Sequence, residues 1–289
     1  MAEPGPARTT GRDSKVGKVM STEDLLVSKD DGVWTLTLNR PAQRNAFSRP
    51  MLDAWERTLR EARDDETARV LVLTGAGSAF CAGGDLSEIQ EKWRRGDSIE
   101  QKNQLWRGVL RVPMALAELD KPVIAAINGA ASGAGLDMAL MCDIRLASDS
   151  ARLAESYINV GLVPGDGGAY FLPRLVGLGR ACELLFTGDP ITAQEAERIG
   201  LINRVVPQEE LLSEAQALAR RIAAKPTQAL RMTKRLIYSG LESSLKTSLD
   251  MSSSFFSHVL ELDETSSAIT TALERISKPR GEQEKPNDN

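Results

Sequence analysis

The chain has 289 residues, a formal net charge of −4 and 42% hydrophobic residues. This length fits one large domain, or one domain with a helical appendage, and the composition is typical of a globular protein. The weak negative charge excludes a broad basic footprint for nucleic acid, and no apolar stretch approaches the ~20 residues of a membrane span, so we expect neither partner.

The predicted elements fall into two parts. An N-terminal arm (1–21) and a tail (279–289) are rich in polar residues, Gly and Pro and are predicted to be disordered. Between them, residues 22–207 predict an α/β core and residues 208–278 a C-terminal helical region. Strands are expected at 33–38, 68–74, 122–127, 143–147, 151–154 and 202–206, and helices at 48–62, 105–119, 135–141, 168–175, 179–186, 192–199, 209–224 and 226–239, with two more to about residue 276. The polar segment 88–102 is expected to be exposed or mobile.

The few cysteine and histidine residues limit the kinds of site that this chain can form. The three cysteines (Cys81, Cys142 and Cys182) lie far apart without metal spacing, which favours a reducing compartment. We therefore expect a cytoplasmic protein with no metal site. The single histidine, His258, lies in a helical pattern near the C-terminus, which disfavours catalytic triads and His-ligated zinc.

Two bends built from small residues carry most of the information. One is Ala79–Leu86 (AFCAGGDL) and the other is Asn128–Asp137 (NGAASGAGLD), and each joins a strand-like run to a helix start. Small residues admit a ligand close to the backbone, and the first N–H groups of a helix lack internal partners. Two such bends can aim two N–H groups at one carbonyl oxygen, which is the layout of an oxyanion hole.

Other glycine-rich motifs do not fit. The segment after the strand at 70–74 begins with Gly75 and Gly77, but Phe80 stands where a dinucleotide-binding fingerprint requires glycine. No Gly-Lys-Ser/Thr of a P-loop occurs, and Ser132 lacks the flanking glycines of a nucleophile elbow.

An ordered set of motifs resembles the crotonase (enoyl-CoA hydratase/isomerase) superfamily. The motifs are Leu38–Pro41 with Asn45–Phe47, Ala79–Leu86, Asn128–Asp143, Gly161–Gly168, and Ala193–Ala196 with Gly200–Ile202, so that the similarity runs from about Asp24 to Lys278. The resemblance implies a spiral of β-β-α units with a C-terminal helical region, in homotrimers that often pair into hexamers. It also implies binding of an acyl-CoA thioester, with coenzyme A only as part of the substrate and no separate cofactor.

The resemblance also assigns positions. The backbone N–H groups of Gly84 and Ala134 would form the oxyanion hole. Arg44 would lie where the CoA nucleotide passes, either on a phosphate or simply exposed. The remaining residues expected to line the path of the substrate are Ala46, Ala82, Gly83, Asp85, Leu86, Gly133, Tyr157, Pro164 and Gly165.

The acid–base residues depart from those of typical hydratases, which carry two glutamates. Here the two positions hold Asp137 and Tyr157. Asp137 is a candidate base, or alternatively only a stabiliser of the first helical turn. Tyr157 cannot act as a carboxylate base, and either orients a group by hydrogen bonding or packs. If residues 153–157 are extended, Glu155 points to the same side as Tyr157 and can replace the missing glutamate. The alternative is that Glu155 is solvated or salt-bridged.

Asp166 is a third candidate, in a loop that edges the acyl pocket in the family, or else a cap for the helix at Gly168. The set favours double-bond isomerisation through a thioester enolate, with water addition to a 2-enoyl-CoA as the alternative. The alternative from another functional class is a non-catalytic protein that binds acyl-CoA.

An apolar stripe lies on the predicted helix near the C-terminus. It is either a subunit interface or intrachain core, and its residues are Met251, Phe255, Phe256, Val259 and Leu260.

Overall fold

The computed structural model describes residues 23–94 and 98–277, so that the predicted disordered arm (1–21) and tail (279–289) lie outside the described residues. The strands are β1 (Leu25–Asp30), β2 (Val33–Leu38), β3 (Val70–Gly75), β4 (Ala79–Cys81), β5 (Val123–Ile127), β6 (Ala130–Ser132), β7 (Ile144–Ser148), β8 (Arg152–Ala154), β9 (Ile191–Thr192) and β10 (Arg204–Val206). The α-helices are α1 (Arg49–Asp64), α2 (Leu86–Arg94), α3 (Ser98–Arg107), α4 (Arg111–Ala117), α5 (Ala134–Leu140), α6 (Gly168–Val176), α7 (Leu178–Thr187), α8 (Ala193–Arg198), α9 (Leu211–Ala223), α10 (Thr227–Gly240), α11 (Leu245–Leu260) and α12 (Asp263–Ser277), with 3-10 turns η1 (Pro41–Gln43) and η2 (Ser156–Val160).

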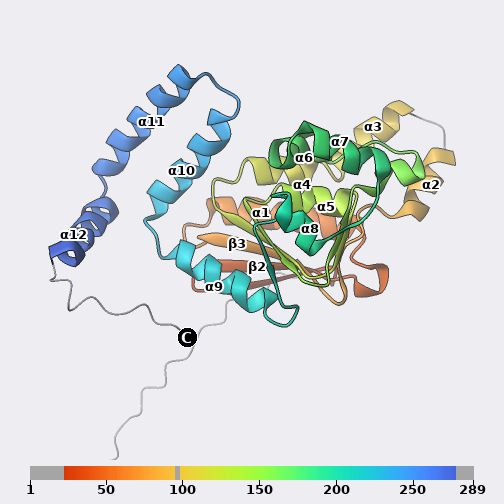
Figure 1. Cartoon of the computed structure of the whole chain (residues 1–289), viewed down its shortest axis with the longest axis horizontal. Helices are drawn as coiled ribbons and strands as arrows, with labels where there is room; N and C mark the ends of the chain where they lie inside the picture. Colours follow the sequence, from red (N-terminus) through yellow and green to blue (C-terminus); the bar gives the residue numbers. More distant parts are fainter. Residues whose placement is uncertain (1–22, 95–97, 278–289) are drawn as a thin grey trace, which may run out of the picture.

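A six-stranded sheet forms the base of the core (Figure 1). Its order is β1-β2-β3-β5-β7-β10, parallel except for the β1–β2 hairpin. Its central strands are buried on both faces, which explains their continuous runs of Val, Leu, Ile and Ala. One face packs on α9 through Leu211, Ala215 and Ala219, and the other carries a larger apolar core that includes the buried side of α1.

A second, smaller sheet positions the site. Its order is β4-β6-β8-β9, and β4, β6 and β8 run parallel with short pairings such as Ala131 with Leu153. The carboxyl ends of parallel strands meet at one edge of a sheet, and ligands bind outside that edge in open α/β folds. The bends after β4 and β6, and the turn after β8, therefore lie together.

The polar segment 88–102 is exposed at most of its described side chains, as the sequence predicted, and it is largely helical, in α2 and α3. The prediction for the segment that follows needs correction. The single helix expected at 105–119 is divided, because α3 ends at Arg107 and α4 begins at Arg111. Gly108 lies at the break, where a methyl group would stand 2.6 Å from the Gln104 carbonyl oxygen.

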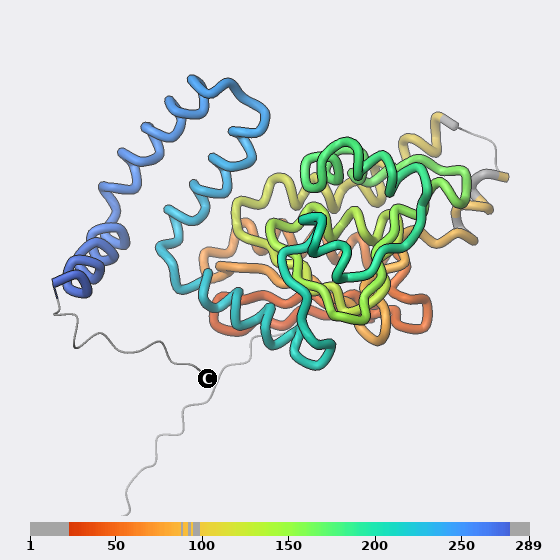
Figure 2. The backbone as a smooth tube through the Cα atoms, in the orientation of Figure 1, coloured from red at the N-terminus to blue at the C-terminus, as the bar shows by residue number. Residues whose placement is uncertain are grey.

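The C-terminal helices form an arm that leaves the core. Helix α9 lies on the sheet, whereas α10, α11 and α12 extend to one side of it (Figures 1 and 2). None of the described residues of these three helices is buried. The stripe predicted on α11 is thus not intrachain core, since Phe256 and Leu260 are exposed and Met251, Phe255 and Val259 are partly exposed.

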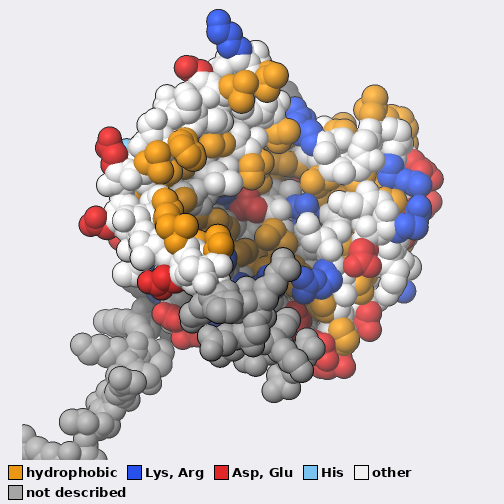
Figure 3. All heavy atoms as spheres, turned by 60° about the vertical axis from the view of Figure 1, so that its left-hand side comes forward, with side chains coloured by type: hydrophobic (Ala, Val, Ile, Leu, Met, Phe, Trp, Pro, Cys, Tyr) orange, Lys and Arg blue, Asp and Glu red, His pale blue; other side chains and the backbone are white. Residues whose placement is uncertain are grey.

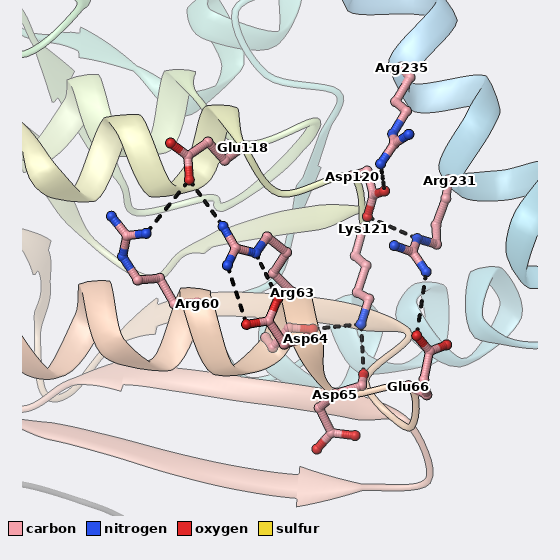
Figure 4. A network of polar contacts seen from close by, with 11 residues as sticks. Arg60, Arg63, Asp64, Asp65, Glu66, Glu118, Asp120, Lys121, Arg231 and Arg235 are labelled. Atoms are coloured by element: carbon pink, nitrogen blue, oxygen red, sulfur yellow. Dashed lines mark hydrogen bonds and ion pairs between the residues drawn. The ribbon is translucent and has the colours of Figure 1, made fainter.

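Ion pairs attach this arm to the core. The Asp120 carboxylate receives hydrogen bonds from Arg231 at 2.9 Å and Arg235 at 2.7 Å, both from α10 (Figure 4). Beside Asp120, the Lys121 ammonium donates to the Ala62 carbonyl and so caps the end of α1. No helix in the described part of the chain combines the length and apolar character needed to cross a bilayer.

Candidate active site

The two glycine-rich bends meet, as the sequence predicted. Gly83 adopts φ +83°, and a methyl group on it would lie 3.1 Å from the Ala134 nitrogen. Helix α5 begins against the end of β4, where a methyl group on Gly135 would lie only 2.2 Å from the Cys81 carbonyl oxygen. Only small residues allow this approach, which explains the composition of both bends.

The backbone N–H groups of Gly84 and Ala134 lie at these bends. Ala134 is the first residue of α5, where an N–H has no helical acceptor. Among the atoms of the described residues we find no acceptor for either N–H group. Both remain available to a ligand oxygen, as an oxyanion hole requires.

Two buried asparagines hold the bends in place, a role that the sequence did not predict. The Asn45 amide nitrogen donates to the carbonyls of Ala79 and Phe80 at 2.8 and 3.1 Å. The Asn128 side chain accepts from the Gly75 N–H and donates to the Ala79 carbonyl. The signal that could have identified them is an asparagine within each motif, directly after β5 for Asn128 and in the turn after η1 for Asn45.

The residues expected along the path of CoA surround the first bend. The loop of Arg44 pairs with it, because Ala82 donates its N–H to the Arg44 carbonyl and Phe47 donates to the Gly83 carbonyl. The Arg44 side chain is exposed, whereas Ala46 is buried. At the other end of the bend, the Asp85 carboxylate accepts from Ser87.

The remaining predicted residues lie at the edges of the site. Leu86 is exposed at the start of α2, Gly133 is the buried residue that precedes α5, and Gly165 is exposed in the loop that leads to Asp166. Pro164, in the same loop, is half-buried.

Three carboxyl groups and one hydroxyl group gather beside α5. Asp137 is 0% exposed, and Glu155 and Asp166 are 2% and 7% exposed. The Tyr157 hydroxyl lies 2.7 Å from Asp137 Oδ2 and 3.1 Å from Asp166 Oδ2. The other oxygen of each aspartate, and both oxygens of Glu155, are buried without a hydrogen-bond partner among the described residues. Buried polar atoms left without partners are rare in folded proteins and indicate a functional site.

The route by which Glu155 and Tyr157 reach the site differs from the extended run considered above. Strand β8 ends at Ala154, and the chain then turns into η2, which is followed by Gly161 in the left-handed region. Both side chains still reach Asp137, since Glu155 leaves the end of the strand and Tyr157 lies in the 3-10 turn. The prediction of proximity is correct, but the extended conformation is wrong.

The helix-cap alternative for Asp166 is also wrong. The residue that precedes α6 is Gly167, and no side chain caps this helix. Asp166 Oδ2 instead lies 3.1 Å from the Tyr157 hydroxyl, within hydrogen-bond distance. Helix α6 comes close to the carboxyl groups at Gly168, where a methyl group would lie 2.4 Å from Asp137 Oδ1 and 3.1 Å from Glu155 Oε2.

Burial dominates the electrostatics of the cluster. It raises the pKa of Asp137, although the Tyr157 hydroxyl, the nearby Gly168 N–H and the Glu155 side chain favour the ionised form. Burial, followed by the charge of Asp137, raises the pKa of Glu155 to about 9 and that of Asp166 to about 6. At neutral pH, Glu155 thus keeps its proton while Asp166 is mostly ionised. The same two causes raise the pKa of Tyr157 far above its ordinary value, so this hydroxyl stays protonated.

Comparison with known proteins identifies the family. The family model described as Enoyl-CoA hydratase/isomerase matches residues 28–283. The chain belongs to the enoyl-CoA hydratase/isomerase family. The spiral α/β core with its helical C-terminal region is the crotonase fold that the resemblance implied.

Relatives within the enoyl-CoA hydratase/isomerase family carry different activities in their names. The chain is 36% identical to a short-chain-enoyl-CoA hydratase of Clostridium acetobutylicum, over 89% of this chain and 97% of that protein. It is 40% identical to the 1,2-epoxyphenylacetyl-CoA isomerase of Escherichia coli, over 79% and 87% of the respective chains. Among solved structures, an enoyl-CoA hydratase from Bacillus anthracis matches with a TM-score of 0.81 at 36% identity, covering 87% of this chain and 96% of that one.

Proposed function

We propose that this enzyme forms the enolate of an acyl-CoA thioester and shifts a double bond, with Asp137 as the base. One observation carries this proposal. Asp137 is fully buried, its Oδ2 is held by Tyr157 and its Oδ1 has no partner in the described part of the chain. A base must present an oxygen to the proton that it removes, and Oδ1, which lies near the Gly168 N–H and the Glu155 carboxyl group without a hydrogen bond to either, is the oxygen that can do so.

The N–H groups of Gly84 and Ala134 are proposed to bind the thioester oxygen. Proton removal next to the thioester carbonyl places negative charge on that oxygen. Fixed backbone donors stabilise such charge without reorganisation, and loss of one oxyanion donor typically costs ~10²–10³ in turnover. The two bends at which these N–H groups lie are held by Asn45 and Asn128, which supports this role.

Water addition is the second candidate, because Glu155 supports it. A carboxyl group that keeps its proton at neutral pH lies beside the Asp137 carboxylate, and hydration of an enoyl thioester needs one acid and one base. The relatives named as hydratases support the same reading. Isomerisation is preferred because the second glutamate position holds Tyr157, whose hydroxyl is engaged with Asp137 and Asp166.

The substrate's CoA portion is proposed to follow the first bend. Arg44, exposed beside Ala82, would meet a phosphate of the nucleotide as a charge-assisted pair. The backbone of Ala46, Ala82, Gly83 and Asp85 would line the same path. Leu86, Gly133, Tyr157, Pro164 and Gly165 would border the acyl end, and coenzyme A enters only as part of the substrate.

The enzyme is further proposed to form a homotrimer, or a dimer of trimers, in the cytoplasm. The C-terminal arm exposes Leu241, Leu245, Leu249 and Phe256, each by 60% or more of its surface. Figure 3 shows hydrophobic side chains gathered on the side of the molecule that carries this arm. Large exposed apolar patches mark sites of association. Light scattering after size exclusion tests the oligomeric state, and a monomer would contradict this proposal.

The reaction is tested by incubating the enzyme with 2-enoyl, 3-enoyl and dienoyl CoA thioesters in D₂O. Products are separated by chromatography and weighed by mass spectrometry. A displaced double bond with deuterium uptake and no water adduct supports isomerisation, whereas a 3-hydroxyacyl product supports hydration. Tight binding with neither product would support the non-catalytic reading and contradict both reactions.

A further inference from the structure

The Tyr157 hydroxyl lies between two buried aspartates. It is 2.7 Å from Asp137 Oδ2 and 3.1 Å from Asp166 Oδ2, and each aspartate keeps its second oxygen without a partner among the described residues. Asp137 comes from α5, Tyr157 from η2 and Asp166 from the loop before α6. Three separate segments of the chain thus place one donor within reach of two carboxylate acceptors.

A hydroxyl group carries one proton and can donate it at full strength to only one of these oxygens. The shorter distance indicates that Asp137 is the acceptor in the resting enzyme. If Asp137 becomes protonated, it no longer needs the hydrogen bond, and Asp166 becomes the better acceptor. Hydrogen bonds to charged acceptors are about twice as strong as those between neutral groups, so the hydroxyl will follow the charge.

We propose that Tyr157 is a positioning residue that turns its hydroxyl from Asp137 to Asp166 while Asp137 holds the substrate proton. This inference rests on the proposed role of Asp137 as the base. During the step, a substrate C–H bond breaks, an O–H bond forms on Asp137 Oδ1, and the electron pair enters the thioester enolate. Tyr157 keeps its own proton throughout. When Asp137 returns the proton to another carbon, the hydroxyl turns back.

The change of hydrogen-bond acceptor requires that Asp166 is ionised while Asp137 is neutral. Burial and the charge of Asp137 raise the pKa of Asp166 to about 6, so it is available as an acceptor at neutral pH. The other group that faces the pair is Glu155, at the end of β8, which keeps its proton at neutral pH. From α6, the Gly168 backbone N–H faces Asp137 and does not titrate.

Carbon-13 NMR of labelled aspartate carboxyl groups tests the proposal without any substrate. Asp166 is titrated in wild type, Y157F, D137N and the double variant, with D166N for assignment. In D137N a neutral amide replaces the protonated Asp137. We expect Y157F to change the pKa of Asp166 by less than about 0.3 when Asp137 is present, and to raise it by about 1 in the D137N background. An equal change in both backgrounds would overturn the proposal.

Y170F is the matched control, because Tyr170 is another tyrosine whose hydroxyl binds a carboxylate, that of Glu242 on the surface. It should leave the Asp166 titration unchanged in both backgrounds. If Y157F does not fold, labelled Tyr157 Cζ gives the same answer. Its resonance should follow the Asp166 titration in D137N and not in wild type, and a resonance that follows it equally in both overturns the proposal.

Exchange of substrate hydrogens for deuterium separates this inference from the proposed function. We expect D166N to slow exchange about 10-fold in wild type and less than 2-fold in Y157F, because Asp166 acts through Tyr157. If the titrations give the expected pattern but wild type exchanges no hydrogen, the proposed function is contradicted while the movement of the hydroxyl is supported. If wild type exchanges hydrogen but the Asp166 titration is independent of Asp137, only this inference fails.

Discussion

The catalytic part of the core and the C-terminal arm differ in whether their charged groups are paired. The core buries Asp137, Glu155 and Asp166 and leaves oxygens of all three without partners among the described residues. The arm buries none of its described residues and is attached through paired charges, such as Arg231 with Asp120 and Lys234 with Asp143. Burying unpaired carboxyl groups costs stability, so their retention in the core indicates a functional site. The ion pairs on the arm instead indicate a structural role in attaching the arm to the core.

Replacement of the proposed base should give the largest effect. In D137N the buried carboxylate becomes a neutral amide of the same size. We expect substrate deprotonation to fall by about 10³-fold, within the range of a lost general base, while the thermal midpoint stays level or rises. Exchange rates and calorimetry measure both. D250N, on the exposed face of α11, is the matched control and should change neither.

Gly135 tests whether the two bends need their close contact. A methyl group at this position would lie 2.2 Å from the Cys81 carbonyl oxygen, so G135A should lose about 3 kcal/mol of unfolding free energy or more. Gly179, in the first turn of α7, has nothing within 4 Å of such a methyl group. G179A should therefore be neutral or slightly stabilising by chemical denaturation. Equal losses in the two variants would contradict the account of the bends.

The buried Glu155 predicts a pH dependence of stability. Its pKa is about 9 in the fold, against an ordinary value of 4.5, so the folded state binds a proton that the unfolded state releases. The stability that this proton supplies is complete below about pH 4.5 and is lost as the pH rises toward 9. The loss is at most about 1.4 kcal/mol per pH unit.

E155Q should remove this slope, because its amide stays neutral at every pH. Unfolding free energies measured from pH 5 to pH 8.5 should show a growing advantage of E155Q over wild type. The exposed Glu209 supplies the control variant E209Q, which should run parallel to wild type. An advantage of E155Q that is constant with pH would show that Glu155 is ionised in the fold.

The attachment of the arm should give the smallest effect. Asp120 is 6% exposed and holds both Arg231 and Arg235. D120N weakens both contacts, and we expect a loss of about 1 kcal/mol in docking of α10, typical of partly exposed ion pairs. Hydrogen exchange of α10 and proteolysis between α9 and α10 should increase. E66Q is the control, because the Glu66 carboxylate is 79% exposed and 4.0 Å from Arg231. It should leave hydrogen exchange and proteolysis unchanged.

The sequence predicted more of the helices and strands, in the core and in the arm, than of the contacts within the acid–base cluster. Periodicity placed α1, β5 and α5 to within two residues at each end, because their apolar patterns are continuous. The bends could be predicted to meet because parallel strands end at one edge. The division of α3 from α4 at Gly108 was missed, because a single glycine does not always end a helical pattern.

The hydrogen bonds of Tyr157 could not be predicted. They depend on a 3-10 turn after β8, and short turns of this kind leave little periodic signal in a sequence. The same turn brings Tyr157 to Asp166, nine residues further on, and so assigns to each aspartate one held and one free oxygen. The roles of Asn45 and Asn128 likewise depend on carbonyl positions that only three-dimensional packing reveals.

In the proposed reaction, the buried core removes a proton next to a thioester carbonyl. The most direct measurement follows a saturated acyl-CoA, which can neither be hydrated nor isomerised, with the wild-type enzyme in D₂O. We predict that mass spectrometry will detect deuterium at the carbon next to the carbonyl, at a rate that depends on Asp137. Saturating binding of the thioester without any deuterium uptake would contradict the account.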